Sequence, residues 1–154
     1  MKKTSIRELY RFQMVSHIFV ILCEIITVVF ITLNYNSFIE SFGIIWSIVF
    51  LIFIIGTLSL LAISTIEDIN TLLKDLKSLK NNDYISIIGK VLKFKKNINP
   101  RAKIQINNKP VIQILDTNEE IELFINDKII IGETYKFNYL KNSKIAEVVE
   151  KILN

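Results

Sequence analysis

Apolar residues are gathered in two long runs near the start of the chain, residues 14–33 and 44–64. The hydrocarbon core of a bilayer is about 30 Å thick, so a helix needs about 20 apolar residues to cross it. Both runs reach that length, whereas the chain beyond residue 64 mixes charged and apolar residues. The pattern predicts a hairpin of two transmembrane helices, and therefore an integral, multi-pass membrane protein.

The first run carries one acid, Glu24, but thirteen of its twenty residues are Ile, Leu, Val or Phe. These contribute roughly −0.3 to −0.6 kcal/mol each, which offsets the roughly +3 kcal/mol of a charge at mid-membrane. The second run has no ionisable side chain, and Trp46 near its start suits the membrane interface. We expect the first run to be retained rather than cleaved as a signal peptide, because it is too long, contains Glu24 and ends without small residues spaced for cleavage.

Basic residues predict the orientation of the hairpin. They precede the first run and follow the second, whereas residues 34–43, which are expected to form a short connecting loop, contain neither Lys nor Arg. The positive-inside rule then places both termini in the cytoplasm of a bacterial inner membrane. The basic positions are Lys2, Lys3, Arg7 and Arg11 in a cytoplasmic N-terminus of residues 1–13, and Lys74, Lys77 and Lys80 after the second run.

Residues 65–82 predict an amphipathic helical stalk. An apolar stripe recurs at spacings of three and four, and neither Gly nor Pro separates this segment from the second run, so we expect one continuous helix. The stripe has two interpretations, which the sequence leaves open: packing on the protein's own tail or the membrane surface, or a short coiled coil between copies. Its members are Ile66, Ile69, Leu73 and Leu76.

Residues 83–154 predict a separate cytoplasmic domain of short strands, because the period changes from helical to alternating at Tyr84. The alternation slips at Gly89, which indicates a β-bulge there. Residues 102–106 and 111–115 suggest a hairpin, and residues 134–140 place Tyr135, Phe137 and Tyr139 on one core-facing side.

The last segment, residues 144–152, fits either a helix or a closing strand, and its valines and the preceding Asn142-Ser143 turn favour the strand slightly. Five or six short strands cannot bury a sufficient core as an open sheet. We therefore expect a small all-β barrel of the OB or SH3-like kind.

The tail also resembles a known group of proteins. Gly132-Glu133-Thr134-Tyr135, then Phe137, Tyr139-Leu140 and Ser143-Lys144, resembles the end of uncharacterised two-span membrane proteins of Gram-positive bacteria. The layout is also similar to the NfeD group, in which membrane spans carry an OB barrel. The glycine pattern of the NfeD group is not matched here, so this second resemblance concerns the architecture alone.

Catalytic residues are not evident in the sequence. The chain has one histidine, His17, and one cysteine, Cys23, and both lie in the first apolar run. A His/Cys metal cluster or a cysteine or serine triad therefore cannot be assembled in the cytoplasmic domain. The four glycines are scattered and form no phosphate-binding loop. We expect no catalytic, cofactor or metal site and interpret the chain as a non-enzyme.

Glu24 and His17 form the first candidate site, because they lie seven residues apart on one helix face and an intramembrane carboxyl usually faces a partner or a water-filled cavity. One hypothesis is a proton- or ion-responsive pair at an oligomer interface. The other is a protonated Glu24 that is hydrogen-bonded to the neighbouring helix at Thr57 or Ser59, with His17 near the headgroups.

A run of six basic residues without an acid forms the second candidate site. It is interpreted as a solvated face, as a contact for lipid headgroups or an acidic protein, or as a nucleic-acid site. We do not expect nucleic acid, because the whole tail is nearly balanced in charge and Phe94, the aromatic among these residues, alternates as a core residue. The run consists of Lys90, Lys93, Lys95, Lys96, Arg101 and Lys103.

These patterns predict a membrane-anchored adaptor or binding module whose cytoplasmic barrel binds a membrane or cytoplasmic protein. The alternative is a small subunit of a transporter or an immunity-type membrane protein, which acts through its hairpin and Glu24. The lipid bilayer is the expected environment in both cases, and a homo-oligomer stays open.

Overall fold

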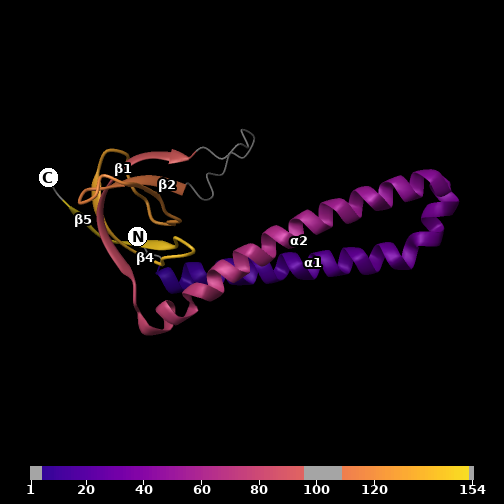
Figure 1. Cartoon of the computed structure of the whole chain (residues 1–154), viewed down its shortest axis with the longest axis horizontal. Helices are drawn as coiled ribbons and strands as arrows, with labels where there is room; N and C mark the ends of the chain where they lie inside the picture. Colours follow the sequence, from indigo (N-terminus) through magenta and orange to yellow (C-terminus); the bar gives the residue numbers. More distant parts are fainter. Residues whose placement is uncertain (1–4, 96–108, 153–154) are drawn as a thin grey trace. The chain divides into compact units, whose positions relative to one another are not determined.

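A computed structural model describes residues 5–95 and 109–152. The chain divides into two compact units, one of residues 13–71 and one of residues 1–12 with residues 72–154. The first unit, called the helical unit below, is a pair of helix segments. The second unit joins the ends of both helices to a β-sheet (Figure 1). The part of the second unit that follows α2 and contains the sheet is called the β-domain.

Two long helices supply the first unit. Helix α1 runs over Ile6–Phe42 and helix α2 over Ile44–Asn81, and both are long and apolar enough to cross a membrane. The expected single helix from the second apolar run through the stalk is confirmed.

The predicted loop at residues 34–43 is wrong, since α1 continues to Phe42 and only Gly43 stands outside the helices. Gly43 has a φ of 74°, a left-handed conformation that glycine adopts without strain, so one residue suffices for the reversal. The Ser47 hydroxyl stays within hydrogen-bonding distance of the Gly43 and Phe38 carbonyl oxygens, at 2.9 and 3.2 Å.

The two apolar runs are staggered within the first unit. His17 Nε2 lies 3.9 Å from Asp68 Oδ2, and the Ser47 hydroxyl reaches Phe38 at the other end. Both contacts fit one antiparallel register, in which residues 21–33 face residues 52–64. The stretch in which both helices belong to an apolar run is therefore shorter than either run.

The β-domain contains five strands in a small antiparallel open sheet, in the order β3-β2-β1-β4-β5. An isolated parallel bridge also joins Phe124, just after β3, to Ile145, just before β5, through N–H···O distances of 2.8 and 2.9 Å. This bridge links the two edges of the sheet. The strands are β1 (Ile85–Lys95), β2 (Lys109–Ile114), β3 (Glu120–Glu122), β4 (Thr134–Tyr139) and β5 (Ala146–Ile152).

The core of the domain lies on the inner face of these strands. Tyr135, Phe137 and Tyr139 are all buried, which confirms the core face predicted for β4. Residues 146–152 form β5, which confirms the strand interpretation of the last segment. The buried cluster consists of Val91, Ile112, Leu123, Ile125, Tyr135, Phe137, Tyr139 and Ala146.

Two predictions about strand pairing need correction. The register of β1 against β2 shifts between Val91 and Lys93, so the bulge lies at Leu92 and not at Gly89. Strand β2 pairs with β1 on one side and β3 on the other, and it therefore belongs to a different hairpin from the one expected. The expected partner strand, residues 102–106, lies outside the described residues.

Gly89 allows close packing of β1 against β2 and does not form the bulge. A Cβ at Gly89 would collide with Ile112 Cγ2 and lie 3.0 Å from the Gln113 carbonyl oxygen. We expect Gly89→Ala to lower the free energy of unfolding by about 2 kcal/mol through overpacking, measured by urea unfolding of the purified chain in detergent. Gly56→Ala is the control, because no atom lies within 4 Å of its Cβ. An equal response of the two variants would contradict this explanation.

Candidate functional site

A buried carboxylate joins α2 to the β-domain. Asp75, in the last third of α2, has none of its surface exposed. Its Oδ1 accepts hydrogen bonds from the Asn142 side-chain amide at 2.6 Å and from the Asn142 backbone N–H at 3.1 Å, and its Oδ2 accepts one from the Ser143 backbone N–H at 2.6 Å. These donors belong to the turn between β4 and β5. Asp75 with these donors is called the Asp75 anchor below.

The electrostatics of the Asp75 anchor favour the charged carboxylate. Burial raises the pKa of Asp75, but the hydrogen bonds from Ser143 and Asn142 together outweigh burial, so the pKa lies below its usual value. Tyr10 is buried beside it and donates from its hydroxyl to the Leu72 carbonyl at 3.0 Å. Burial, and then the Asp75 charge, raise the pKa of Tyr10.

The Asp75 anchor predicts an acid-sensitive contribution to stability. Because the pKa of Asp75 is lower in the folded protein than the unfolded value of about 3.9, its contribution is fully present above about pH 4. It is lost as the pH falls through the folded pKa. We expect the difference in unfolding free energy between the wild type and Asp75→Asn to be constant from pH 6 to 8 and to shrink below pH 4. A difference that grows towards acid would contradict this assignment.

The start of α1 also contacts the β-domain. The Ile6 backbone N–H, at the first turn of α1, donates to Glu147 Oε2 on β5 at 3.2 Å, and Ile6 and Leu9 are buried. The Arg7 guanidinium donates to Asn82 Oδ1, just past the end of α2, at 2.9 Å. Both helix ends are therefore fastened within one compact unit.

The face of the stalk that packs differs from the predicted stripe. Thr65, Leu72 and Asp75 are the buried positions of the stalk. Of the predicted stripe, Ile66 and Leu73 are 53% and 49% exposed, whereas Ile69 and Leu76 are half-buried. The burial of Asp75 was not predicted, because the predicted stripe consists of apolar residues only. The sequence does indicate that Asp75 shares a helix face with two leucines, because it lies three residues after Leu72 and four before Leu79.

Three of the predicted basic residues share the outer face of β1. The bulge at Leu92 shifts the alternation by one residue, so Lys90, Lys93 and Lys95 all point outward while Val91 is buried. We call these three the basic face. The other three residues of the predicted run, Lys96, Arg101 and Lys103, lie outside the described residues.

One acid partly neutralises the basic face. Lys95 Nζ lies 2.8 and 3.1 Å from the two carboxylate oxygens of Glu122 on the neighbouring part of the sheet. The hydrogen bond from Lys95, followed by the charges of Lys95, Lys109 and Lys93, lowers the pKa of Glu122. Lys90 has no such partner within residues 5–95 and 109–152.

Glu24 and His17 are both on α1, in the helical unit. The contact that the structure gives His17 is with Asp68 of α2, at 3.9 Å. Glu24 Oε1 is buried, and no group in the described part of the chain forms a hydrogen bond with it. The expected bond from Thr57 to this oxygen is absent, because the Thr57 hydroxyl lies 2.9 Å from the Ile54 carbonyl oxygen of its own helix and donates there.

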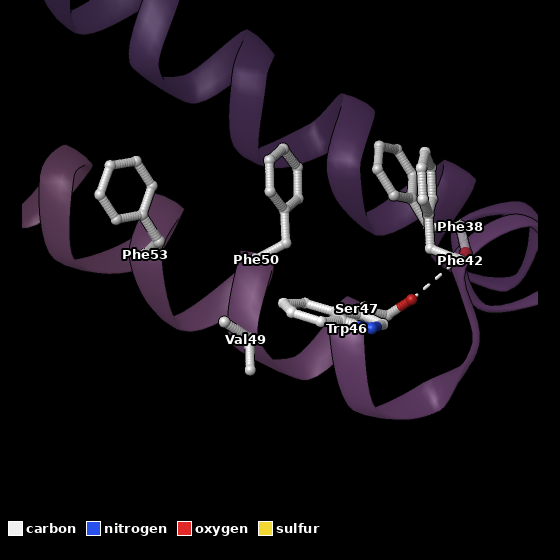
Figure 2. Close-up of a pocket in the computed structure, with 7 residues that line it drawn as sticks. All are labelled: Phe38, Phe42, Trp46, Ser47, Val49, Phe50 and Phe53. Carbon is white, nitrogen blue, oxygen red and sulfur yellow. Dashed lines mark hydrogen bonds between the residues drawn. The ribbon is translucent and has the colours of Figure 1, made fainter.

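An aromatic pocket lies at the Gly43 end of the helical unit and was not predicted (Figure 2). It measures about 410 Å³, and its lining is apolar apart from Ser47. Phe38 stacks on both Phe42 and Phe50, with ring centroids 5.6 Å apart in each pair. The lining residues are Phe38, Phe42, Trp46, Ser47, Val49, Phe50 and Phe53.

Metal ligands are not clustered within the described ranges, which contain no group of three or more His, Cys, Asp or Glu residues able to hold a metal ion. Comparison with protein-family models, with curated proteins and with solved structures gives no significant match.

Proposed function

We propose that the chain is a membrane-anchored, non-enzymatic adaptor: a two-helix hairpin holds a small OB-like barrel at the cytoplasmic face of a bacterial inner membrane, and the barrel binds a protein partner. The observation that carries this proposal is the Asp75 anchor. Three donors of the β4–β5 turn converge on one fully buried carboxylate of α2, so the domain is fastened directly to the helix end. This fastening ties the β-domain to the end of the helix that begins with the second apolar run, as a membrane-held binding module requires.

Membrane anchorage is supported by three features. Both helices have the length and hydropathy of membrane spans, and large apolar side chains such as Leu60, 71% exposed, cover the surface of the helical unit. Trp46 and its aromatic neighbours gather at the Gly43 end, as in the aromatic belt of a membrane interface. Basic residues occur on the opposite side of both apolar runs, which favours cytoplasmic termini.

The OB-like barrel is supported by the strand order. Strand β1 lies between β2 and β4, and the edge strands β3 and β5 approach each other through the parallel bridge of Phe124 and Ile145. A five-stranded sheet whose edge strands approach each other in this way supports the proposal of a partly open OB barrel. The resemblance to two-span Gram-positive membrane proteins with a small β-domain agrees with this arrangement.

The basic face is the surface that we assign to the partner. Lys90 and Lys93 are exposed on β1, whereas Lys95 forms a salt bridge with Glu122. Exposed cations steer and select partners of opposite charge more than they add affinity. A protein with an acidic patch therefore fits this face best.

Photo-crosslinking in intact cells tests the adaptor. A photo-reactive phenylalanine at Ile88, which shares the outer face of β1, is expected to crosslink one stoichiometric protein partner. Lys90→Gln/Lys93→Gln should reduce this product at least tenfold. Lys128→Gln/Lys141→Gln, which removes two exposed charges elsewhere on the domain, should leave it unchanged. A second variant carries the same photo-reactive residue at Leu60 of the helical unit. Self-crosslinks of this variant, without any crosslinked partner from the Ile88 variant, would refute the adaptor.

The second candidate function, a subunit of a transporter or an immunity-type protein, is favoured by one observation, the buried Oε1 of Glu24 without a hydrogen-bond partner among the described residues. A carboxyl held without a partner in a hairpin is expected where a second copy or another subunit completes the site. If so, Glu24→Gln shifts the oligomer measured by crosslinking or native mass spectrometry, while Cys23→Ser beside it does not. Unchanged assembly and an unchanged cellular phenotype would exclude this candidate.

A further inference from the structure

Three basic side chains line one hollow in the unit that contains the β-domain. The hollow measures about 300 Å³, and its lining residues are Arg7 and Arg11 of α1 and Leu79 and Lys80 of α2. We call it the basic hollow. It lies outside the basic face on β1 and is built by both helices.

Among the described residues, no ion pair neutralises the charges of the basic hollow. Arg7 donates to the neutral Asn82 amide oxygen at 2.9 Å, which holds its guanidinium in place but leaves its charge uncompensated. Arg11 and Lys80 have no ion-pair or hydrogen-bond partner in the described part of the chain. The carboxylate of nearby Glu8 instead accepts from the Ser5 backbone N–H.

Like charges that converge without an acid repel one another, and an anion bound between them relieves the repulsion. Arginine guanidinium groups match the oxygen geometry of phosphate, and lysine adds a point charge. A volume of about 300 Å³ also reaches the lower end of the range for ligand pockets, so a phosphate group with its substituents fits.

We propose that the basic hollow binds a phosphate-bearing anion, either the headgroup of an anionic phospholipid or a soluble phosphate compound. The inference rests on the membrane anchorage in the proposed function, because Arg11 precedes the first apolar run by three residues and would then lie beside the headgroups. Such a site would fix the membrane end of the domain on anionic lipid.

Native mass spectrometry of the full chain in neutral detergent tests the site without any effect of membrane orientation. Phosphatidylglycerol is expected to bind more tightly than phosphatidylcholine, and Arg11→Gln/Lys80→Gln should weaken its binding roughly 30-fold at about 1 kcal/mol per charge. Lys74→Gln/Lys77→Gln removes two exposed charges of the same helix outside the hollow and should change binding less than threefold. Arg11→Lys/Lys80→Arg keeps both charges and should therefore bind phosphatidylglycerol about as tightly as the wild type.

Inorganic phosphate distinguishes the two sources. If millimolar phosphate displaces the lipid, a soluble phosphate compound is the ligand; if it does not, the lipid headgroup is. Equal loss in the two double glutamine variants, or no preference for phosphatidylglycerol, would overturn the site. Carbonate extraction of membranes tests the anchorage separately: an integral protein without the lipid preference refutes this inference alone, whereas a carbonate-extractable protein refutes the proposed function.

Discussion

Replacing Phe137 with alanine is expected to lower the free energy of unfolding of the β-domain by about 4 kcal/mol, the typical cost of removing a buried phenylalanine side chain. Phe137 is fully buried in β4, and its neighbours Ile87 on β1 and Val148 on β5 lie on either side of it in the sheet. The Tyr135 ring packs at 5.9 Å between centroids. The substitution therefore removes contacts on several sides at once and leaves a cavity.

The measurement is urea unfolding of the purified full chain in mild detergent, followed by near-ultraviolet circular dichroism of the tyrosines. Ile130→Ala is the matched control, because Ile130 is an apolar residue of the same domain that is 59% exposed. It should change the free energy of unfolding by less than about 0.5 kcal/mol. A Phe137→Ala variant as stable as the control would contradict the assignment of the core.

Replacing Asp75 with alanine is expected to lower the free energy of unfolding by about 3 kcal/mol. The substitution removes the charged acceptor of the Asn142 and Ser143 donors, and hydrogen bonds to a charged group contribute about 1.5–3 kcal/mol. The loss should be local first, so the amide hydrogens of Asn142 and Ser143 should exchange faster with solvent than those of β1.

Asp83→Ala is the control for the Asp75 anchor, since Asp83 is an exposed acid just beyond the end of α2. We expect it to change the free energy of unfolding by less than about 0.5 kcal/mol. If Asp75→Ala matched this control and left hydrogen exchange at Asn142 unchanged, the helix end would not be fastened to the domain by Asp75.

Strong periodic patterns made the main elements predictable from the sequence. Apolar runs of about 20 residues identified both helices, and the alternation of Tyr135, Phe137 and Tyr139 identified the core face of β4. Local composition was enough for β5 as well. In each case one burial pattern dominated the segment.

Features that depend on other parts of the chain were not predictable. The partners of Asp75 are backbone groups 67 and 68 residues away, and no periodicity reports such a contact. Gly89 was expected to mark a bulge. A glycine is needed at this position because Ile112 approaches it closely, which only the pairing of β1 with β2 reveals. Residues 34–42 were expected to form a connecting loop, but Gly43 alone reverses the chain and α1 extends through them.

Cysteine labelling in intact cells tests the central claim, that a membrane hairpin holds the β-domain in the cytoplasm. In a Cys23→Ser background, Asn36→Cys near the Gly43 turn and Asp116→Cys in the β-domain place one exposed thiol on each predicted side. A membrane-impermeant maleimide should label Asn36→Cys in intact cells and Asp116→Cys only after the membrane is permeabilised. Labelling of Asp116→Cys in intact cells, or recovery of either variant in the soluble fraction, would contradict it.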